Sequence, residues 1–365
     1  MASISLCMIV KDEEQTLARC LESAQGIADE IIVADTGSAD RTREIAARYG
    51  RVVDFAWRDD FAAARNFSFA QAAGDFILWL DADDVIPLGE RARLLALKAR
   101  LDEKTDMVML PYRTAFDEVG RPTFVYYRER IVRRRAGFVW QGAVPECITP
   151  RGTVVYGDAA VEHRRIKPVD GGRNLRIYEK QLAAGAALDA RGQVYYAREL
   201  AAHGRHEQAA AAFRVFLARP DGWLENRIEA ARGLAASLAA LGRGEDAVQA
   251  LLASFAWDAP RPESCCALAA LLLTQGKAAA AEFWYRTAFI APENARSGGF
   301  VQPQYRDFVP YLGLCQCCDR LGRPAEAKAW NERAAALRPE SEAVRHNRAY
   351  FSRRRSDRGG AADIE

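Results

Sequence analysis

Two closely spaced aspartates, Asp81 and Asp83, come directly after an unbroken apolar run at residues 76–80. Such a run is typical of a strand that is covered on both faces within a parallel sheet. Ligands of open α/β sheets bind outside the carboxyl ends of the strands, and residues two apart in an extended chain point to the same side. Carboxylate oxygens favour Mg²⁺ or Mn²⁺, whose coordination substrate phosphates often complete. The pattern therefore indicates a divalent-cation site.

An Asp-x-Asp pair occurs by chance in many chains, so three interpretations compete. An EF-hand loop is excluded because Val85 and Ile86 stand where a ligand and the required glycine would be. A phosphatase of the haloacid dehalogenase type fits the strand, the sequence from Asp81 to Val85 and a later acidic motif at residues 157–162. A nucleotide-sugar glycosyltransferase fits the same aspartates, and the remainder of the chain must separate the two.

The elements that must position the aspartates alternate between short apolar strands and amphipathic helical stretches. This alternation is typical of successive βα units, so we predict an α/β domain with a mainly parallel sheet. Two further strands end in acids, because residues 12–14 follow the first and Asp35 ends the second before a glycine turn. Helix capping explains Asp40 but not Asp35. The strands are predicted at residues 4–10, 31–34, 52–55, 76–80 and 107–110.

Four motifs, taken together and in this order, resemble the family 2 glycosyltransferases of the GT-A fold. The resemblance is strongest to a bacterial branch that carries tetratricopeptide repeats behind the catalytic domain. It covers residues 4 to about 180 and implies a GT-A-like, nucleotide-sugar-binding domain over residues 1–185. No dinucleotide or P-loop glycine motif competes with it. The motifs are MIVKDEE at 8–14, DEIIVADTGS at 29–38, DFAAARN at 60–66 and LDAD at 80–83.

The resemblance also implies roles for individual residues. Asp35 is expected to bind the uracil or ribose of the nucleotide-sugar. Asp81 and Asp83 are expected to form the DXD element that holds the ribose and a Mn²⁺ or Mg²⁺ ion. His163 matches a histidine that reaches the metal or the diphosphate, and a purely structural histidine is the alternative. The residues expected around the nucleotide and diphosphate are Glu13, Glu14, Arg65 and Asn66.

The acceptor side is predicted at residues 140–146, WQGAVPE, which resemble the Gly-x-Val-His-Glu element of the same family. Pro145 stands where the family has His, which removes a titratable group and stiffens the loop. Asp12 replaces the usual Asn of the first motif, a milder departure. Glu146 is thereby the candidate general base, and an ion-paired surface glutamate is the alternative.

The sequence beyond about residue 190 is rich in Ala, is helical in pattern and has no strand signal. Repeated helix–turn–helix units of about 34 residues are typical of tetratricopeptide repeats. We therefore predict an all-α repeat domain over residues 190–350, interrupted by an insertion at 293–308, and a disordered tail over 352–365. The glycines that mark successive turns are Gly204, Gly242, Gly276 and Gly322.

Composition excludes several classes of protein. A chain of 365 residues with 50% hydrophobic and 27% charged residues is long enough for two globular domains and is neither disordered nor fibrous. The net charge of +2 gives no case for nucleic acid. The first apolar run lacks the basic flank of a signal peptide, and no run reaches the length of a transmembrane segment. We expect a cytoplasmic protein whose eight cysteines stay reduced.

These patterns predict a metal-dependent, inverting glycosyltransferase that moves a sugar from a nucleotide-sugar, expected to be a UDP-sugar, to a peptide, protein or cell-envelope acceptor. The repeats are expected to hold a peptide or protein acceptor. One alternative is a scaffold whose front domain has lost activity. The phosphatase alternative does not explain why two strands within the first eighty residues end in acidic residues.

Overall fold

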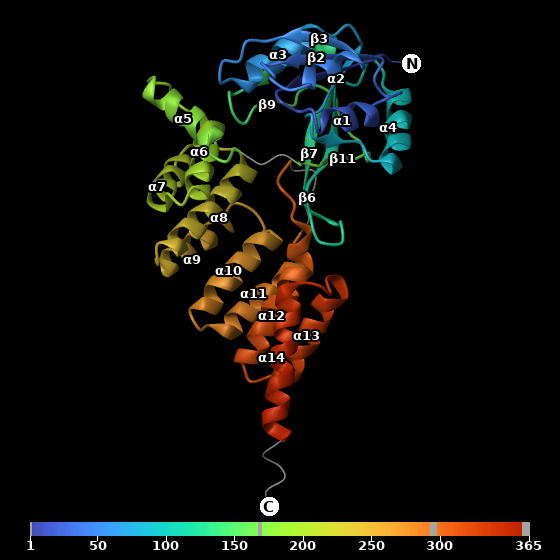
Figure 1. Ribbon diagram of the computed structural model, residues 1–365. Coiled ribbons are helices and arrows are strands. Elements are labelled where there is room, and N and C mark those ends of the chain that lie inside the picture. Colours follow the sequence, from blue (N-terminus) through green and yellow to red (C-terminus); the bar gives the residue numbers. More distant parts are fainter. Residues whose placement is uncertain (1, 167–169, 293–297, 360–365) are drawn as a thin grey trace, which may run out of the picture. The chain divides into compact units, whose positions relative to one another are not determined.

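The chain folds into two compact units in a computed structural model that describes residues 2–166, 170–292 and 298–359 (Figure 1). The first unit comprises Met1–Ala115 and Val125–Tyr195, and the second comprises Phe116–Phe124 and Tyr196–Glu365. The division falls close to the sequence-based boundary at 185–190. A short segment, 116–124, groups with the helices of the second unit although its neighbours in the chain belong to the first.

A mixed sheet forms the centre of the first unit, with its strands in the order β3-β2-β1-β4-β7-β6-β11-β5 and β10 beside β6. The pairs from β3 to β4 are parallel, as are those of β6 with β10 and β11. The α/β class is confirmed, but β7 and β5 are antiparallel to β4 and β11. The bounds are β1 Ile4–Val10, β2 Glu30–Asp35, β3 Arg51–Asp54, β4 Phe76–Trp79, β5 Asp84–Val85, β6 Met107–Phe116, β7 Pro122–Arg133, β10 Val154–Tyr156 and β11 Val161–His163.

Helices cover the central strands on both faces, as the apolar runs predicted. Leu6 and Leu78 lie in one core with residues of α1 and α4, whereas Cys7 and Trp79 lie in a second core with residues of α3. Both faces of β1 and β4 are therefore buried. The helices of this unit are α1 Leu17–Ser23, α2 Thr42–Ala47, α3 Phe61–Ala70, α4 Leu88–Arg100 and α5 Arg173–Ala183, and the short strands β8 Trp140–Gln141 and β9 Cys147–Ile148 pair with each other.

The strand order places a topological switch between β1 and β4. From β1 the chain moves to β2 and β3 on one side, and it then returns to add β4 on the other side. Ligands of open α/β sheets bind where the carboxyl ends of two such strands diverge. The loop after β1 and the aspartates after β4 therefore meet at the edge where a ligand is expected.

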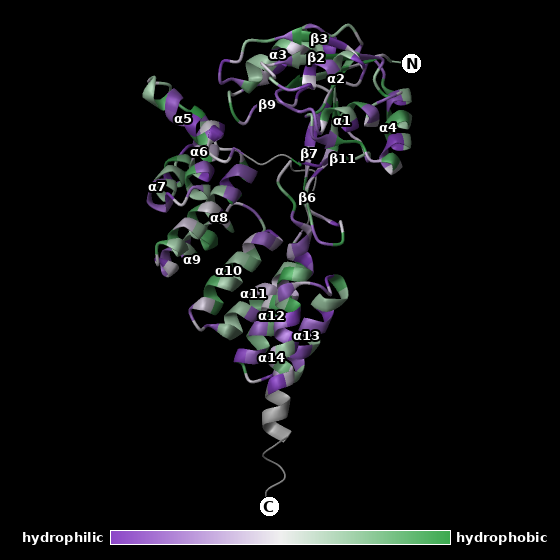
Figure 2. Cartoon of the chain, in the orientation of Figure 1, coloured by the Kyte–Doolittle hydropathy of each residue, from purple (hydrophilic) through white to green (hydrophobic). Residues whose placement is uncertain are grey.

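The second unit is a series of antiparallel helix pairs that resembles tetratricopeptide-type repeats. The four glycines predicted to mark its turns have φ values between 71° and 77°. Glycine adopts this left-handed conformation without penalty where a helix ends. Figure 2 shows hydrophobic and hydrophilic residues alternating around these helices. The helices are α6 Ala190–Ala202, α7 His206–Leu217, α8 Leu224–Ala240, α9 Gly244–Ser254, α10 Pro262–Thr274, α11 Ala278–Ile290, α12 Phe308–Arg320, α13 Pro324–Leu337 and α14 Glu342–Gly359.

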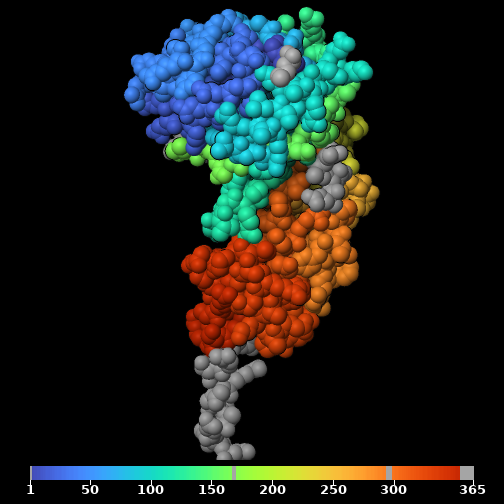
Figure 3. Space-filling model, turned by 90° about the vertical axis from the view of Figure 1, so that its right-hand side faces the viewer, coloured from blue at the N-terminus to red at the C-terminus, as the bar shows by residue number. Residues whose placement is uncertain are grey.

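Residues 116–124, the tip of the hairpin formed by β6 and β7, pack within the second unit (Figure 3). Asp117 is almost fully buried and pairs with Arg338 at 3.1 Å, and Arg121 donates to the carbonyl of Leu337. Phe124 packs against Phe300 of the inserted segment, with their ring centroids 5.2 Å apart. Nothing in the local sequence of the hairpin indicated these contacts.

Two predicted segments fall partly outside the described residues. Residues 293–297 of the insertion are outside them, and residues 303–306 form a 3-10 turn (η2, Pro303–Arg306). The helix α14 continues to Gly359 through the first part of the predicted tail, and residues 360–365 lie outside the description. No helix among the described residues is long and apolar enough to cross a membrane.

Gly313 of α12 provides a test of the repeat packing, because a Cβ atom there would overlap the ring of Tyr285 on α11. We expect Gly313→Ala to lower the free energy of unfolding by about 1–3 kcal/mol, since overpacking outweighs the better helix propensity of Ala. Gly244→Ala is the matched control, because its Cβ would make only an ordinary contact with Gln275. Urea unfolding followed by circular dichroism measures both, and equal stability of the two variants would contradict the packing.

Candidate active site

A cleft of about 540 Å³ lies where the carboxyl ends of β1 and β4 diverge. Its described lining residues come from the ends of β1 and β2, the start of α3, the loop after β4, and two later segments, 144–146 and 163–174. Most of the lining side chains are charged or aromatic. This volume is within the range of sites that bind small molecules and cofactors.

Arg65 joins the two sides of the cleft. Its guanidinium donates at 2.6 Å to Asp81 after β4 and at 2.6 Å to Glu146 of the later segment 144–146. The side chain is 7% exposed and lies 4.8 Å from the ring centroids of both Trp79 and Trp140. Asp60 places it, because its carboxylate caps the first turn of α3 at the backbone N–H of residue 63. One buried guanidinium thus forms ion pairs with two carboxylates that are distant from each other in the sequence.

Asp84 supports the loop from behind and is the site residue that the sequence argument missed. Its carboxylate is fully buried and accepts from Tyr112 at 2.7 Å, from Arg130 at 2.8 Å and from the backbone N–H of Asp81 at 3.0 Å. Tyr112 and Arg130 lie on β6 and β7, far along the chain. The run of three acids gave no signal that the third would turn inward.

Asp83 and His163 lie together on the open side of this loop. The Nδ1 atom of His163 is 3.2 Å from a carboxylate oxygen of Asp83 and 3.0 Å from the hydroxyl of Tyr112. Asp83, Asp84 and His163 each offer a ligand atom, and these atoms lie within 4.8 Å of one another. Because Asp84 already accepts from Arg130, Tyr112 and the loop, the side chains of this cluster with capacity for a cation are Asp83 and His163. The carboxylate of Asp81 is outside the cluster and pairs with Arg65.

The ionisation of Asp81 and that of His163 are shifted in opposite directions by their neighbours. Burial opposes ionisation of Asp81, but Arg65 and Arg130 outweigh it and hold the pKa of that carboxyl well below its usual range. Burial also opposes ionisation of His163, yet Asp83 and Asp84 raise its pKa to about 9. An imidazolium without a bound cation therefore contributes stability that is complete below about pH 6.5 and is lost as the pH rises through about 9.

The other predicted nucleotide-binding residues separate into two groups. Glu13 lines the cleft, whereas Glu14, Asp35 and Asn66 are not among its described lining residues. Asp35 is buried, and hydrogen bonds from Ser38, Gly37 and Arg43 outweigh its burial and lower its pKa. Glu14 accepts a hydrogen bond from Arg41. The side-chain amide of Asn66 donates to the carbonyl of Trp140 and accepts from the backbone N–H of the same residue. These three side chains hold neighbouring loops in place.

Three further residues shape the cleft and were absent from the sequence-based set. Trp57 and Phe61 form an edge-to-face pair with ring centroids 4.7 Å apart. Arg173, in the first turn of α5, lies over the Phe61 ring at 4.6 Å. Phe61 belongs to the DFAAARN motif and Trp57 precedes it, so their proximity to Arg65 in the sequence was the available signal. Arg173 belongs to α5, more than a hundred residues after Phe61, so its position depends on a contact between distant segments that the local sequence does not indicate.

Comparison with known proteins gives a family for this unit. Residues 5–152 match a family model described as Glycosyl transferase family 2. Over these residues the chain resembles the family 2 glycosyltransferases. The matched segment contains both strand-end groups of acids, Arg65 and Glu146, and it contributes most of the described lining residues of the cleft.

Relatives of the chain include proteins of both kinds that its two units resemble. A TPR repeat-containing protein of Synechococcus elongatus is 54% identical over 89 residues, 24% of this chain and 22% of that protein. The putative glycosyltransferase EpsH of Bacillus subtilis is 29% identical over 127 residues, 33% of this chain and 36% of that protein. The chain thus matches well under half the length of either relative.

One of the similar solved structures is glucosyl-3-phosphoglycerate synthase from Mycobacterium tuberculosis in complex with Mn²⁺, UDP-glucose and phosphoglyceric acid. It is 27% identical, with a TM-score of 0.27, over 31% of this chain and 44% of that chain.

Replacing Arg65 by Met tests the double ion pair, because Met keeps the packing between Trp79 and Trp140 but removes the charge. We expect the free energy of unfolding at pH 7 to fall by about 3–5 kcal/mol, since two carboxylates lose their buried partner. The loss should shrink in acid, because Arg65 depresses the pKa of Asp81 and that stabilisation disappears as the pH falls through the lowered value.

Arg48→Met, at an exposed position of the same unit, serves as the control and should change stability by about 0.5 kcal/mol or less. Chemical unfolding at pH 7 and at about pH 2, below the ordinary pKa of an aspartate, measures both variants. A loss at Arg65 no larger than that at Arg48 would contradict the bridging role.

Proposed function

We propose that this protein is a metal-dependent, inverting glycosyltransferase that transfers a sugar from a nucleotide-sugar, in the first instance a UDP-sugar, to an acceptor hydroxyl, thiol or amine. The observation that carries the proposal is one cleft, lined largely by the segment that matches the family 2 model, whose lining residues include Asp81, Asp83, His163, Arg65 and Glu146. The cleft thus offers carboxylates for a cation, cations for a diphosphate and a carboxylate for a proton.

The donor set suits a divalent cation of the Mn²⁺ or Mg²⁺ type. Asp83 and His163 would hold it, and Asp81 would contribute to the same ion or to the ribose of the donor. Carboxylate oxygens suit both ions, and an added imidazole favours Mn²⁺ over Mg²⁺. A cation bound here stabilises the charge of the departing nucleotide diphosphate.

Arginines supply the protein's own share of that stabilisation. Arg165 lies 3.6 Å from Asp83 and lines the cleft, and Arg173 lies above Phe61 at its rim. Guanidinium groups match the geometry of phosphate oxygens and stay charged at all working pH values. We assign both residues to the diphosphate of the donor. Arg65 instead orients Asp81 and Glu146 through its two ion pairs.

Glu146 is the proposed general base. Its carboxylate is 11% exposed, borders the cleft, and is held by Arg65 from the side that faces the protein. A base in this position removes the proton of the acceptor nucleophile while the nucleophile attacks the anomeric carbon in line with the departing diphosphate. The bond to the new acceptor then forms on the opposite face of the sugar, which inverts its configuration.

The repeat unit is proposed to hold the acceptor or a partner polypeptide rather than the donor. Concave surfaces of stacked helix pairs bind extended ligands, and the nucleotide-type motifs all precede residue 90. A scaffold function is the second candidate, because the ion pair between Arg65 and Glu146 occupies the proposed base.

Metal-dependent binding of UDP is the first test. Isothermal titration of the full chain with UDP should show higher affinity with Mn²⁺ than with EDTA, and Asp83→Ala should abolish the difference. Glu103→Ala, at an exposed position, should retain it. Equal UDP affinity with Mn²⁺ and with EDTA in the wild type would remove the metal assignment and favour the scaffold.

Substitution of the proposed base is the second test. Glu146→Gln keeps the shape and an oxygen for Arg65 but removes the basicity, so transfer should fall by roughly 10²–10⁴-fold while UDP-sugar affinity is kept. Glu103→Gln should leave the rate unchanged. Turnover assays with saturating donor make the comparison, and an unaltered rate in folded Glu146→Gln protein would eliminate the assignment.

A further inference from the structure

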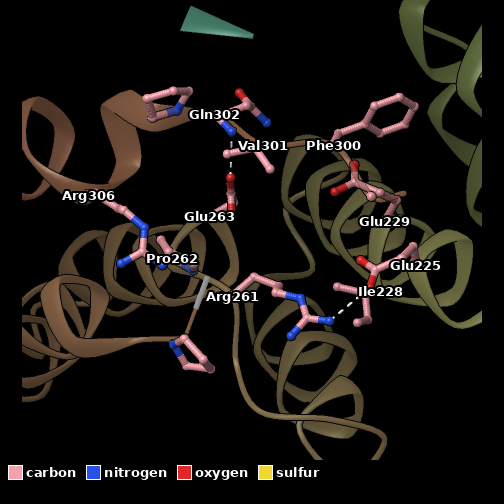
Figure 4. A pocket seen from close by; sticks show the side chains of 13 residues that line it. Glu225, Ile228, Glu229, Arg261, Pro262, Glu263, Phe300, Val301, Gln302 and Arg306 are labelled. Carbon is pink, nitrogen blue, oxygen red and sulfur yellow. Dashed lines mark hydrogen bonds and ion pairs between the residues drawn. The ribbon is translucent and has the colours of Figure 1, made fainter. Parts of the chain in front are cut away.

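A second pocket lies within the repeat unit, between the beginnings of α8 and α10 and the segment 299–306 (Figure 4). It is small, with a cavity volume of about 30 Å³, so it admits a group of the size of a water molecule or an ammonium group rather than a large ligand. The residues that line it combine three glutamates, two arginines and a set of apolar side chains.

The three glutamates differ in their partners. Glu225 accepts from Arg261 at 2.9 Å, and Arg261 also pairs with Asp258 at 2.8 Å. Glu229 accepts from Arg232 at 2.6 Å. These two acids are therefore already neutralised by arginines of the same unit.

Glu263 is the acid that lacks such a partner. Its side chain belongs to a residue that is 6% exposed, and its recorded hydrogen bond is from the backbone N–H of Gln302 at 2.9 Å. Within the described parts of the chain, no lysine or arginine nitrogen forms an ion pair with it. Burial raises the pKa of Glu263, the charge of Glu229 adds to the rise, and Arg232 offsets part of it. A cation in the pocket would remove this penalty.

The walls suit an alkyl chain that ends in a charge. Pro262 and Val301 line the pocket beside Glu263, and Ile228 lines it beside Glu225 (Figure 4). Lysine side chains commonly lay their methylene groups along apolar surface and direct the ammonium group to a polar site. The small volume favours the compact ammonium of lysine over the wider, planar guanidinium of arginine.

We propose that this pocket binds the side chain of a lysine from a polypeptide partner, with Glu263 accepting a charge-assisted hydrogen bond from the ammonium group. The proposal rests on the proposed function only in taking the repeat unit as the part that holds a polypeptide. The alternative to a ligand-binding role is a structural one. Glu263 lies in the first turn of α10, where a carboxylate stabilises the helix.

Fluorescence anisotropy of the full chain with a labelled trilysine peptide, in the absence of any UDP-sugar, tests the proposal. We expect the wild type and the control Glu245→Gln, on the exposed side of α9, to bind the peptide, and Glu263→Gln to bind it about tenfold more weakly or worse. The same peptide with acetylated lysines should bind the wild type no better than Glu263→Gln binds the parent peptide.

The variant's stability separates the two roles of Glu263. If it binds a ligand, Glu263→Gln should melt at the same temperature as the wild type or higher, because an ionised acid that burial penalises has been removed. Several results would overturn the proposal: no binding by the wild type, equal binding of the acetylated peptide, tighter binding of triarginine, or a lower melting temperature with unchanged affinity. Peptide binding without any transfer activity would instead contradict only the proposed function.

Discussion

The buried charge of Arg65 is the interaction on which the cleft depends. Two carboxylates, Asp81 and Glu146, line the cleft in surroundings where an unpaired charge is costly, and one guanidinium compensates both. The rings of Trp79 and Trp140 pack against it, each with its centroid at 4.8 Å. Asp81 is proposed to serve the donor and Glu146 the acceptor, so in this proposal the same cation sets the spacing between the two halves of the reaction.

The fold around this cation follows from features that are local in the sequence. The apolar run at residues 76–80 predicted a strand covered on both faces, and β4 has this character because its alternate residues enter two different cores. The acids after β1 and β4 lie at one edge because the strands that carry them are parallel neighbours. The repeating glycines marked the turns of the helical unit because a left-handed residue is required there.

The remaining features depend on contacts between distant segments, which spacing alone does not encode. Asp84 looks like its neighbours in the sequence, yet it is buried because Arg130 and Tyr112 arrive from β7 and β6. The carboxylate of Asp35 accepts hydrogen bonds from its own turn, which the spacing did not indicate, and its role toward a ligand stays a prediction. The hairpin tip at 116–124 carries no pattern that would assign it to the helical unit.

The most direct test of the central claim is the release of UDP from a panel of UDP-sugars by the full chain in the presence of Mn²⁺. The account predicts that at least one donor is consumed, slowly to water when no acceptor is present, and that the activity disappears with EDTA and in the double variant Asp81→Asn, Asp83→Asn. Folded wild-type protein that binds UDP with Mn²⁺ but releases none from any donor, even with candidate acceptors added, would contradict the claim.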